Sequence, residues 1–320
     1  LVENYFYSNS YRKFVERRNM KVGLVGLGKM GFNLALNLKD NGVEVKGFDL
    51  SDDARQEVEK HGISSVQSLA ELVEALETPR VIWMMVPSGE ATESTISQVL
   101  PLLEKDDILI DAGNSNYKDS IRHGEEAAKL GVRFLDLGTS GGTSGARYGA
   151  CLMAGGDQSA YEYLKDVFES VAVKNGCDYV GPAGAGHFMK MVHNGIEYGM
   201  MEAIGEGFAV MQKAPFDYDL AQVARNWQNG SVIRSWLIDL IEEQLRVHPN
   251  LKDFKGIVDA SGEAKWTVEA ALAEDVPVPV IAQSLFERNA SKLGEENFSN
   301  KVTAALRNGF GGHAYVAEEA

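Results

Sequence analysis

Between residues 21 and 156 the chain alternates short apolar runs with longer amphipathic stretches. This alternation is typical of a parallel sheet whose strands are connected by helices. Helices are predicted at residues 30–40, 51–60 and 119–130, among others. Strands are predicted at residues 21–26, 44–49, 81–86, 107–113, 132–138 and 151–156. We therefore expect a doubly wound α/β domain with a parallel sheet in this half of the chain.

The pattern changes at residues 181–184, where the sequence GPAG interrupts any regular element. Beyond it, apolar residues recur at helical spacing, and residues 186–213 predict one long helix with apolar side chains on most faces. We expect most of that helix to be buried. Further helices are predicted at residues 220–228, 231–244, 268–273 and 280–293. The expected organisation is an N-terminal extension (1–19), an α/β domain (20–182) and an all-helical domain (183–320) that ends in a tail.

The composition narrows the class of protein. Lys and Arg number 31 against 46 Asp and Glu, a formal net charge of −15, which disfavours binding of nucleic acid or anionic membranes. An anionic small molecule would therefore need a local cluster of cations. Cys151 and Cys177 form no CxxC motif, so neither a disulfide framework nor a metal site is predicted. Because no apolar run reaches about 18 residues and no signal-peptide pattern is present, we expect a cytoplasmic protein. Met20 is either the natural start or is preceded by an ordinary extension.

A glycine-rich motif, GLGKMG, follows the first predicted strand and opens the first predicted helix. Its glycines are needed for a tight turn, for close approach of the backbone to a pyrophosphate and for packing of helix on strand. The phosphates would lie at the helix N-terminus. This context predicts a Rossmann-type dinucleotide site. The residues expected there are Gly26, Leu27, Gly28, Lys29, Met30, Gly31, Asp49, Val86 and Asn114.

Asp49 ends the second predicted strand and indicates which dinucleotide is bound. A carboxylate at this place accepts hydrogen bonds from a ribose 2′-hydroxyl and repels a 2′-phosphate. Residues 50–53 (LSDD) supply no cation for such a phosphate, so NAD is favoured over NADP. The alternative is that Asp49 only caps the next helix, a task for which Ser51 is equally suited.

Four polar residues, Lys190, His193, Asn194 and Glu197, are spaced i, i+3, i+4 and i+7 in the long predicted helix. This spacing places them on one helix face. Burial of Lys and Glu is costly unless they are paired or used, so the stripe is either a structural ion network or an active site. Gly195 and Gly199 interrupt the same helix, which suggests that some group approaches its backbone closely.

The segment GAGHFMKMVHNGIEYG, together with GLGKMG, DAGNSNY and the SGG of LGTSGGTSGARYG, resembles the decarboxylating 6-phosphogluconate dehydrogenases. The resemblance extends from Met20 to the C-terminal FGGHAYV and is to the short form of that family. It implies oxidation of the 3-hydroxyl of 6-phosphogluconate by hydride transfer to NAD, followed by loss of CO2 and protonation to ribulose 5-phosphate.

The resemblance also implies roles for particular residues. Lys190 matches the catalytic lysine, which accepts the hydroxyl proton and then polarises the new carbonyl; burial would lower its pKa toward the working pH. Glu197 matches the acid that protonates C1. The residues that match substrate-binding positions are Asn114, Ser140, Gly141, Gly142, His193, Asn194, Tyr198, Lys265, Arg288, Arg307 and His313.

The last five of these form the expected anion-binding cluster, in which Arg288 matches the phosphate-binding arginine. Arg307 and His313 match a C-terminal tail that reaches into a neighbouring subunit, which implies a homodimer or homotetramer. One departure concerns DASGEAKWT, which replaces the glycine- and threonine-rich loop typical of the family and retains Lys265 in register.

Two other functions are compatible with parts of the pattern. A β-hydroxyacid dehydrogenase of the 3-hydroxyisobutyrate or tartronate-semialdehyde type shares the glycine motif, the SGG turn and the Lys190–Asn194 spacing. Such enzymes do not ordinarily carry His193, Glu197 and Tyr198 in this arrangement. A non-catalytic NAD-binding sensor would be expected to lose the lysine or the glutamate, and both are present.

Overall fold

The computed structural model describes residues 20–294 and 297–317. The chain divides into two compact units, of which unit 1 ends at Lys190 and unit 2 begins at Met191. The division falls inside one helix, α9 (Ala185–Gln212). The extension predicted at residues 1–19 lies outside the described residues. The boundary predicted after residue 182 lies shortly before α9 begins and stays a prediction.

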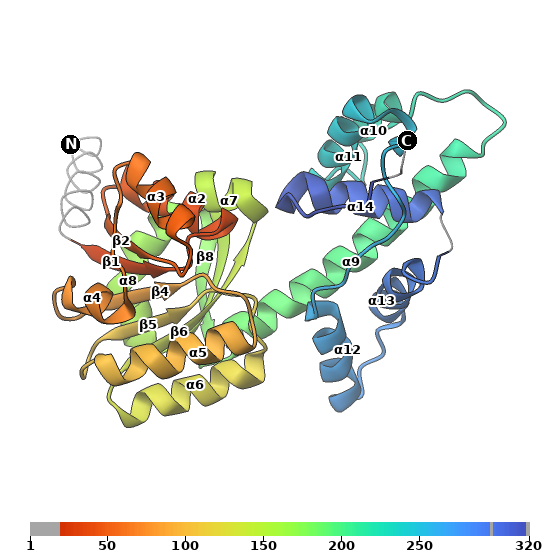
Figure 1. The fold of residues 1–320 in the computed structure, drawn as a ribbon. Helices are drawn as coiled ribbons and strands as arrows, with labels where there is room; N and C mark the ends of the chain where they lie inside the picture. Colours follow the sequence, from red (N-terminus) through yellow and green to blue (C-terminus); the bar gives the residue numbers. More distant parts are fainter. Residues whose placement is uncertain (1–19, 295–296, 318–320) are drawn as a thin grey trace, which may run out of the picture. The chain divides into compact units, whose positions relative to one another are not determined.

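Unit 1 is built on an eight-stranded sheet with the order β3-β2-β1-β4-β5-β6-β7-β8 (Figure 1). Neighbouring strands are parallel except for β6 and β7, which pair antiparallel. The predicted doubly wound parallel fold is thereby confirmed. The strands are β1 (Lys21–Val25), β2 (Glu44–Phe48), β3 (Ser64–Ser65), β4 (Val81–Met84), β5 (Ile108–Asp111), β6 (Arg133–Ser140), β7 (Ala150–Gly156) and β8 (Ala172–Gly181).

The two strands that the sequence analysis missed, β3 and β8, are the edges of this sheet. Strand β3 has only two residues. Strand β8 has the sequence AVKNGCDYVG, and none of its residues is fully buried. Because an edge strand faces solvent along one side, it needs no apolar run, and the hydrophobic pattern gives no signal for it.

Helices cover both faces of the sheet. The side chains of the central strands alternate between two cores: Trp83 of β4 belongs to the core shared with α2, α3 and α8, whereas Ile82 and Met84 belong to the core under α4, α5 and α6. Such alternation is expected for strands buried on both faces. The helices of this unit are α2 (Lys29–Asp40), α3 (Asp52–Lys60), α4 (Leu69–Glu74), α5 (Glu90–Val99), α6 (Tyr117–Lys129), α7 (Gly142–Tyr148) and α8 (Gln158–Val171).

Unit 2 is helical in its described part, as predicted. Its core takes side chains from all six helices α9 to α14, together with Leu251 of a short 3-10 helix and the loop residues Phe254 and Val258. After α14 the chain turns back, so that Tyr315 stacks on Phe254 with ring centroids 4.0 Å apart. The remaining helices are α10 (Leu220–Gln228), α11 (Trp236–Val247), α12 (Glu263–Ala273), α13 (Pro279–Ser291) and α14 (Phe298–Gly311). Helix α14 was not predicted and corrects the expectation that Arg307 lies in a tail, since Arg307 is inside this helix.

The expectation that most of α9 is buried holds for one side of the helix in the described chain and fails for the other. Met191, Tyr198, Met201 and Phe208 are buried, but the other large apolar side chains of the helix are not. The packed elements cover only one side of α9, and a helix with apolar residues all round then exposes the rest. The exposed apolar side chains are Phe188, Met189, Ile196, Met200 and Val210, at 37%, 48%, 53%, 42% and 71% exposure.

Candidate functional site

The glycine motif forms a tight turn between β1 and α2. Gly26 has a φ of +91°, and a Cβ there would lie 2.5 Å from the carbonyl oxygen of Met85. A Cβ on Gly31 would lie 1.8 Å from the carbonyl oxygen of Gly26, so helix and turn pack without room for a methyl group. A Cβ on Gly28, in contrast, would have no atom within 4 Å. The first and third glycines are therefore required by packing, and the second faces open space.

The N-terminus of α2 has the geometry of a phosphate-binding site. Gly28 is the N-cap, and no side chain caps the helix. Lys29 and Met30 are the first two residues of this 12-residue helix. Uncapped amides at a helix N-terminus bind anions through their N–H groups and the helix dipole. The open space beside Gly28 and the uncapped helix together fit the pyrophosphate of a dinucleotide.

Asp49 follows β2 and connects it to the glycine turn. Its Oδ2 accepts a hydrogen bond from the Leu27 amide at 2.7 Å, and its Oδ1 accepts one from the Ser51 amide at 2.8 Å. The cap of α3 is Ser51, whose hydroxyl accepts a hydrogen bond from the Ala54 amide. The capping role considered for Asp49 therefore belongs to Ser51, and the carboxylate of Asp49 is held beside the predicted cofactor turn.

The sequence analysis missed a cation near Asp49. The guanidinium of Arg55, which is 7% exposed, donates hydrogen bonds to the Asp49 carbonyl oxygen, to the Asp52 carboxylate and to Gln67. Arg55 lies just beyond residues 50–53, the segment that was predicted to supply no cation for a 2′-phosphate. Its guanidinium is committed to Asp52, which lessens its value for binding a phosphate.

Val86 and Asn114 lie at the same edge of the sheet, beyond the ends of β4 and β5. A Cβ on Gly26 would be 3.2 Å from Val86, and one on Gly113 would be 2.7 Å from the Val86 carbonyl oxygen. Asn114 is exposed directly after Gly113. Strand order reverses between β1 and β4, and ligands of open α/β sheets bind at such switch points. The structure thus brings the predicted cofactor residues of unit 1 together.

The SGG turn lies at the end of β6. Ser140 is the last residue of that strand, and Gly141 and Gly142 follow with φ values of +116° and +60°. A Cβ on Gly141 would be 2.9 Å from the Cα of Gly145. Positive φ and close packing both require glycine here. The turn therefore presents backbone rather than side chains where the resemblance places the substrate.

The first turn of α9, which carries Lys190, is fixed to the sheet. The carboxylate of Asp136 on β6 is fully buried and accepts hydrogen bonds from the Gly184 and His187 amides, both at 2.8 Å. A Cβ on Gly186 would lie 2.4 Å from the carbonyl oxygens of Asp136 and Met153. Since a Cβ on Gly138 would be 2.6 Å from Lys190 Cβ, the lysine backbone is held directly against β6. Lys190 itself is 7% exposed.

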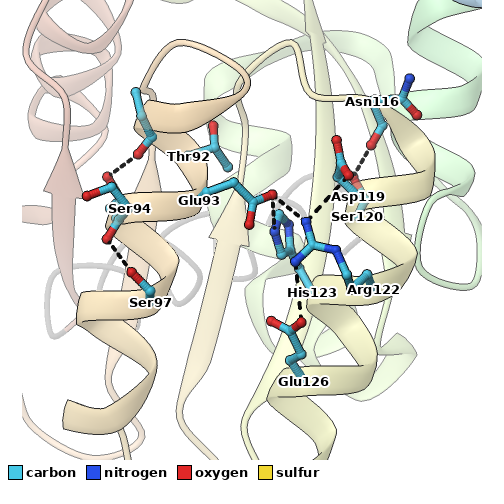
Figure 2. A network of polar contacts seen from close by, with 12 residues as sticks. Thr92, Glu93, Ser94, Ser97, Asn116, Asp119, Ser120, Arg122, His123 and Glu126 are labelled. Carbon is cyan, nitrogen blue, oxygen red and sulfur yellow. Dashed lines mark hydrogen bonds and ion pairs between the residues drawn. The ribbon is translucent and has the colours of Figure 1, made fainter.

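A polar network ties the helices on this face to the start of α9. Glu93 of α5 accepts hydrogen bonds from Arg122 and, at 2.9 Å, from the buried His123 of α6 (Figure 2). One turn earlier on α6, the Ser120 hydroxyl lies 2.7 Å from Nδ1 of His187 in α9. The Arg122 guanidinium lowers the pKa of Glu93, so this carboxylate is charged at neutral pH. The network thereby holds α5, α6 and the start of α9 in register.

In unit 2, α9 places His193, Asn194 and Glu197 on one face, as their spacing predicts. His193 Nδ1 is 2.9 Å from Asn194 Oδ1 and 3.9 Å from Glu197 Oε2. Asn194 is 9% exposed, and its amide donates a hydrogen bond to the Glu263 carboxylate at 3.0 Å. The interruption of the helix by Gly195 is explained by Thr267 of α12, which would lie 3.1 Å from a Cβ at that position.

Tyr198, Arg288 and Arg307 form a cationic cluster in the same unit. Arg288 and Arg307 are 2% and 8% exposed, and within the described residues neither makes an ion pair with a carboxylate. Burial lowers the pKa of Arg288 to about 10, and the charge of Arg307 adds to this effect. The charges of Glu197 and Glu202 offset this lowering in part. Two buried guanidiniums without a carboxylate at ion-pair distance are costly, and a multiply charged anion would relieve that cost.

The remaining predicted substrate residues lie elsewhere in unit 2. Lys265 is on an exposed side of α12, where its ammonium is 3.7 Å from Glu269. His313 is exposed just after α14, with its ring 5.9 Å from that of Phe310. In the described ranges, no group of three or more His, Cys, Asp or Glu side chains is placed to hold a metal ion. Nor does any described helix combine the length and apolar character that crossing a membrane needs.

A Rossmann-type unit with an open glycine turn, a helical unit, and a stripe of Lys190, Asn194 and Glu197 along the helix α9 that belongs to both are typical of an NAD(P)-binding dehydrogenase. Residues 21–181 match the NAD binding domain of 6-phosphogluconate dehydrogenase, and residues 186–319 match the 6-phosphogluconate dehydrogenase C-terminal domain. The chain therefore belongs to the 6-phosphogluconate dehydrogenase family.

Relatives of known name agree with this assignment. The chain is 50% identical to YqeC of Bacillus subtilis, provisionally named a 6-phosphogluconate dehydrogenase, over 92% of this chain and 99% of the relative. It is 43% identical to the NAD(+)-dependent, decarboxylating 6-phosphogluconate dehydrogenase of Haloferax volcanii, over 94% of this chain and all of the relative. Among solved structures, Plasmodium falciparum 6-phosphogluconate dehydrogenase matches with a TM-score of 0.77 at 31% identity, covering 89% of this chain and 70% of that one.

Proposed function

We propose that this chain catalyses the oxidative decarboxylation of 6-phosphogluconate to ribulose 5-phosphate and CO2 with NAD as the hydride acceptor. The observation that carries the proposal is the buried pair Arg288 and Arg307 beside Tyr198, without carboxylate partners in the described chain. Such a pair suits the phosphate dianion of a sugar phosphate. It also supplies the local cation cluster that a chain of net charge −15 needs to capture an anion.

NAD, when bound, takes up a hydride from the substrate carbon that bears the 3-hydroxyl. Lys190, buried at the start of α9, accepts the proton of that hydroxyl as a neutral amine and polarises the resulting carbonyl as an ammonium ion. Glu197, two turns further along the same helix, delivers a proton to C1 after CO2 has left. Asn114, His193, Asn194 and the turn at residues 140–142 hold the carboxylate and hydroxyls of the substrate.

The preference for NAD over NADP is also part of this proposal. It is supported by the Asp49 carboxylate beside the glycine turn and by the commitment of Arg55 to Asp52. The Haloferax relative named NAD(+)-dependent is in line with it. A 2′-phosphate would meet the Asp49 charge, whereas a 2′-hydroxyl can donate a hydrogen bond to it.

We further propose that the active form is a cytoplasmic homodimer or homotetramer. The apolar side chains exposed along α9 support association, because a contiguous exposed apolar surface is costly in water. His313 is exposed beyond α14, and the family resemblance implies that it reaches another subunit's site.

The decisive assay measures CO2 release and reduced nucleotide from 6-phosphogluconate, with NAD and NADP in turn. Lys190→Met should abolish oxidation with little change in NAD affinity, and Glu197→Gln should slow formation of ribulose 5-phosphate. Two exposed residues give matched controls. Lys213→Met, just after the end of α9, is the control for Lys190→Met, and Glu206→Gln, within α9, is the control for Glu197→Gln. Full activity in both site variants would contradict the assigned roles.

Two other outcomes would favour the alternatives. Faster NAD reduction with 3-hydroxyisobutyrate than with 6-phosphogluconate would indicate a β-hydroxyacid dehydrogenase. That class shares the fold, since a 3-hydroxyisobutyrate dehydrogenase of Mycobacterium tuberculosis matches with a TM-score of 0.68 at 25% identity, over 88% of this chain and 98% of that one. NAD binding without turnover of any sugar acid would indicate a sensor.

A further inference from the structure

The carboxylate of Glu263 has no part in the proposed mechanism, yet it is buried against the substrate-binding face of α9. Glu263 is 2% exposed, and its Oε1 accepts the hydrogen bond from Asn194 Nδ2 at 3.0 Å. Its Oε2 is buried and has no hydrogen-bond partner in the part of the chain that the structure describes. A buried carboxylate that lacks a cation is expensive to keep. Its retention therefore requires a reason beyond packing.

The position of this carboxylate is fixed by the start of α12. Glu263 is the first residue of that helix, after the N-cap Gly262, where the helix dipole favours a negative charge. The Thr267 hydroxyl lies 2.8 Å from the carbonyl oxygens of both Glu263 and Met191, and so joins the first turn of α12 to α9. Glu263 is thus held on a rigid element at a constant distance from Asn194.

An ionised carboxylate can only accept hydrogen bonds, and this decides which way the Asn194 amide points. The NH2 group must face Glu263, and Oδ1 must then face His193, whose Nδ1 is 2.9 Å away. An amide oxygen cannot donate, so the His193 nitrogen facing it must carry the proton. The nearby Glu197 carboxylate, 3.9 Å from the same Nδ1, favours the same state. In neutral His193 the lone pair then resides on Nε2.

We propose that Glu263 is a positioning residue that acts through Asn194 to hold neutral His193 as its Nδ1–H tautomer. Its benefit to catalysis rests on the proposed function: Nε2 of His193 becomes a permanent acceptor for a substrate hydroxyl, and the Asn194 amide cannot flip. Without Glu263, either end of the amide can face His193, and both tautomers of the ring become accessible. The proposal gives a role to the departure DASGEAKWT noted in the sequence.

The test is nitrogen NMR of the full chain labelled with nitrogen-15 in its six histidines. The His193 signals are those that are absent from the spectrum of the His193→Gln variant. The spectra are recorded at a pH where the ring is neutral. The wild-type chain is expected to show a protonated Nδ1 and an unprotonated Nε2. A protonated Nε2 in the wild type would overturn the proposal, and this measurement requires no change at Glu263.

Two variants extend the test. Glu263→Met removes the acceptor and is expected to shift His193 toward a mixture of tautomers, whereas Glu263→Gln retains an amide oxygen and should restore much of the wild-type signal. Glu274→Met alters an exposed glutamate at the end of the same helix and is the control. An unchanged tautomer in a folded Glu263→Met chain would refute the proposal.

Kinetics separate this inference from the proposed function. If 6-phosphogluconate is the substrate, Glu263→Met should lower its kcat/KM on the order of 100-fold, the effect typical of a misplaced site group, without changing the KM for NAD. Glu263→Gln should recover about tenfold of this loss, since one hydrogen bond is restored. If no sugar acid is turned over, the proposed function is refuted. The NMR result still decides whether Glu263 sets the tautomer of His193.

Discussion

The guanidinium carbon of Arg288 lies 3.2 Å from the centroid of the Tyr198 ring. The Tyr198 hydroxyl in turn accepts a hydrogen bond from the Ser261 amide at 3.0 Å, which fixes the ring. Cation–π stacking of this kind fixes the plane of the guanidinium. Its N–H groups make only long hydrogen bonds, to the Asp259 carbonyl oxygen at 3.4 Å and to the Met201 sulfur at 3.9 Å. Although burial lowers the pKa of Arg288 to about 10, the group is charged at neutral pH. The orientation of Arg288, the proposed phosphate ligand, is therefore set by Tyr198.

Arg288→Lys should weaken substrate binding without affecting the cofactor. An ammonium ion cannot stack on Tyr198 or bind a phosphate through two parallel hydrogen bonds, so we expect the KM for 6-phosphogluconate to rise about 10- to 100-fold. The KM for NAD should stay within error. Lys292→Met, which removes an exposed lysine 2.9 Å from Asp259, is the matched control. Equal kinetics of the lysine variant and the wild type would remove Arg288 from the site.

Gly28→Ala should separate folding from cofactor binding. The residue has a φ of −64°, which alanine adopts, and its Cβ would meet no atom within 4 Å. Thermal unfolding should therefore be unchanged. The added methyl group would occupy the space beside the α2 N-terminus, and we expect the NAD dissociation constant to rise about tenfold or more, the consequence of overpacking by 1–3 kcal/mol.

Gly207→Ala provides the comparison, because its Cβ also meets no atom within 4 Å and the residue lies in α9 far along the chain from the glycine turn. Calorimetric titration of NAD into both variants distinguishes a local from a general effect. If NAD binds Gly28→Ala as tightly as it binds wild type, the pyrophosphate does not approach this glycine.

Asp136→Asn should disturb catalysis through the first turn of α9. The amide group would direct NH2 protons at one of the two backbone N–H groups that the carboxylate now accepts from, those of Gly184 and His187. We expect a loss of about 2–3 kcal/mol in the free energy of unfolding, typical of hydrogen bonds to a buried charged group. Because Lys190 follows within one turn, kcat should fall while the NAD dissociation constant is retained.

The control for this variant is Asp157→Asn, which alters the N-cap of α8 in the same unit. That carboxylate accepts hydrogen bonds from the Ala160 amide at 2.8 Å and from the Ser159 hydroxyl. Because Asn caps a helix about as well as Asp does, the variant should lose less than about 1 kcal/mol. Urea unfolding and steady-state kinetics are measured on both proteins. A variant at Asp136 that is destabilised but turns over at the wild-type rate would show that α9 tolerates the change.

Glu93→Gln should make the free energy of unfolding less dependent on pH in the acid range. The pKa of Glu93 is lowered chiefly by the hydrogen bond from Arg122, so the ionised carboxylate binds fewer protons in the folded state than in the unfolded state. Its contribution is complete above the ordinary pKa of about 4.5 and disappears as the pH falls through the lowered value. We expect the variant to be about 0.5–1 kcal/mol less stable at pH 7, and the difference to shrink as the pH falls below about 4.5 and through the lowered pKa. A difference that persists in acid would assign the effect to packing.

Local signals in the sequence were sufficient for much of the fold. The turn at Gly26, Gly28 and Gly31 depends on residues adjacent in the chain, so its spacing revealed it. The edge strand β8 has no apolar pattern. Helix α14 was not predicted, because the resemblance of its last residues to a family tail was given more weight than the helical spacing of its apolar residues.

Long-range contacts could not be inferred in the same way. Asp136 precedes the amides of α9 that it binds by about fifty residues, and Glu263 is 69 residues from Asn194. Nothing in the spacing of either residue signals its partner. Arg55 follows residues 50–53 within one helical turn. A prediction that included the whole first turn of the helix after Asp49 would have contained this cation.

Helix α9 carries Lys190 and Glu197 on one continuous backbone. Their separation along the axis, about 10 Å for seven residues, is set by main-chain hydrogen bonding rather than by loops or by neighbouring side chains. If the proposed roles hold, the pockets around the two groups can change, and with them the sugar acids that are accepted, while the helix keeps the spacing between the proposed base and the proposed acid.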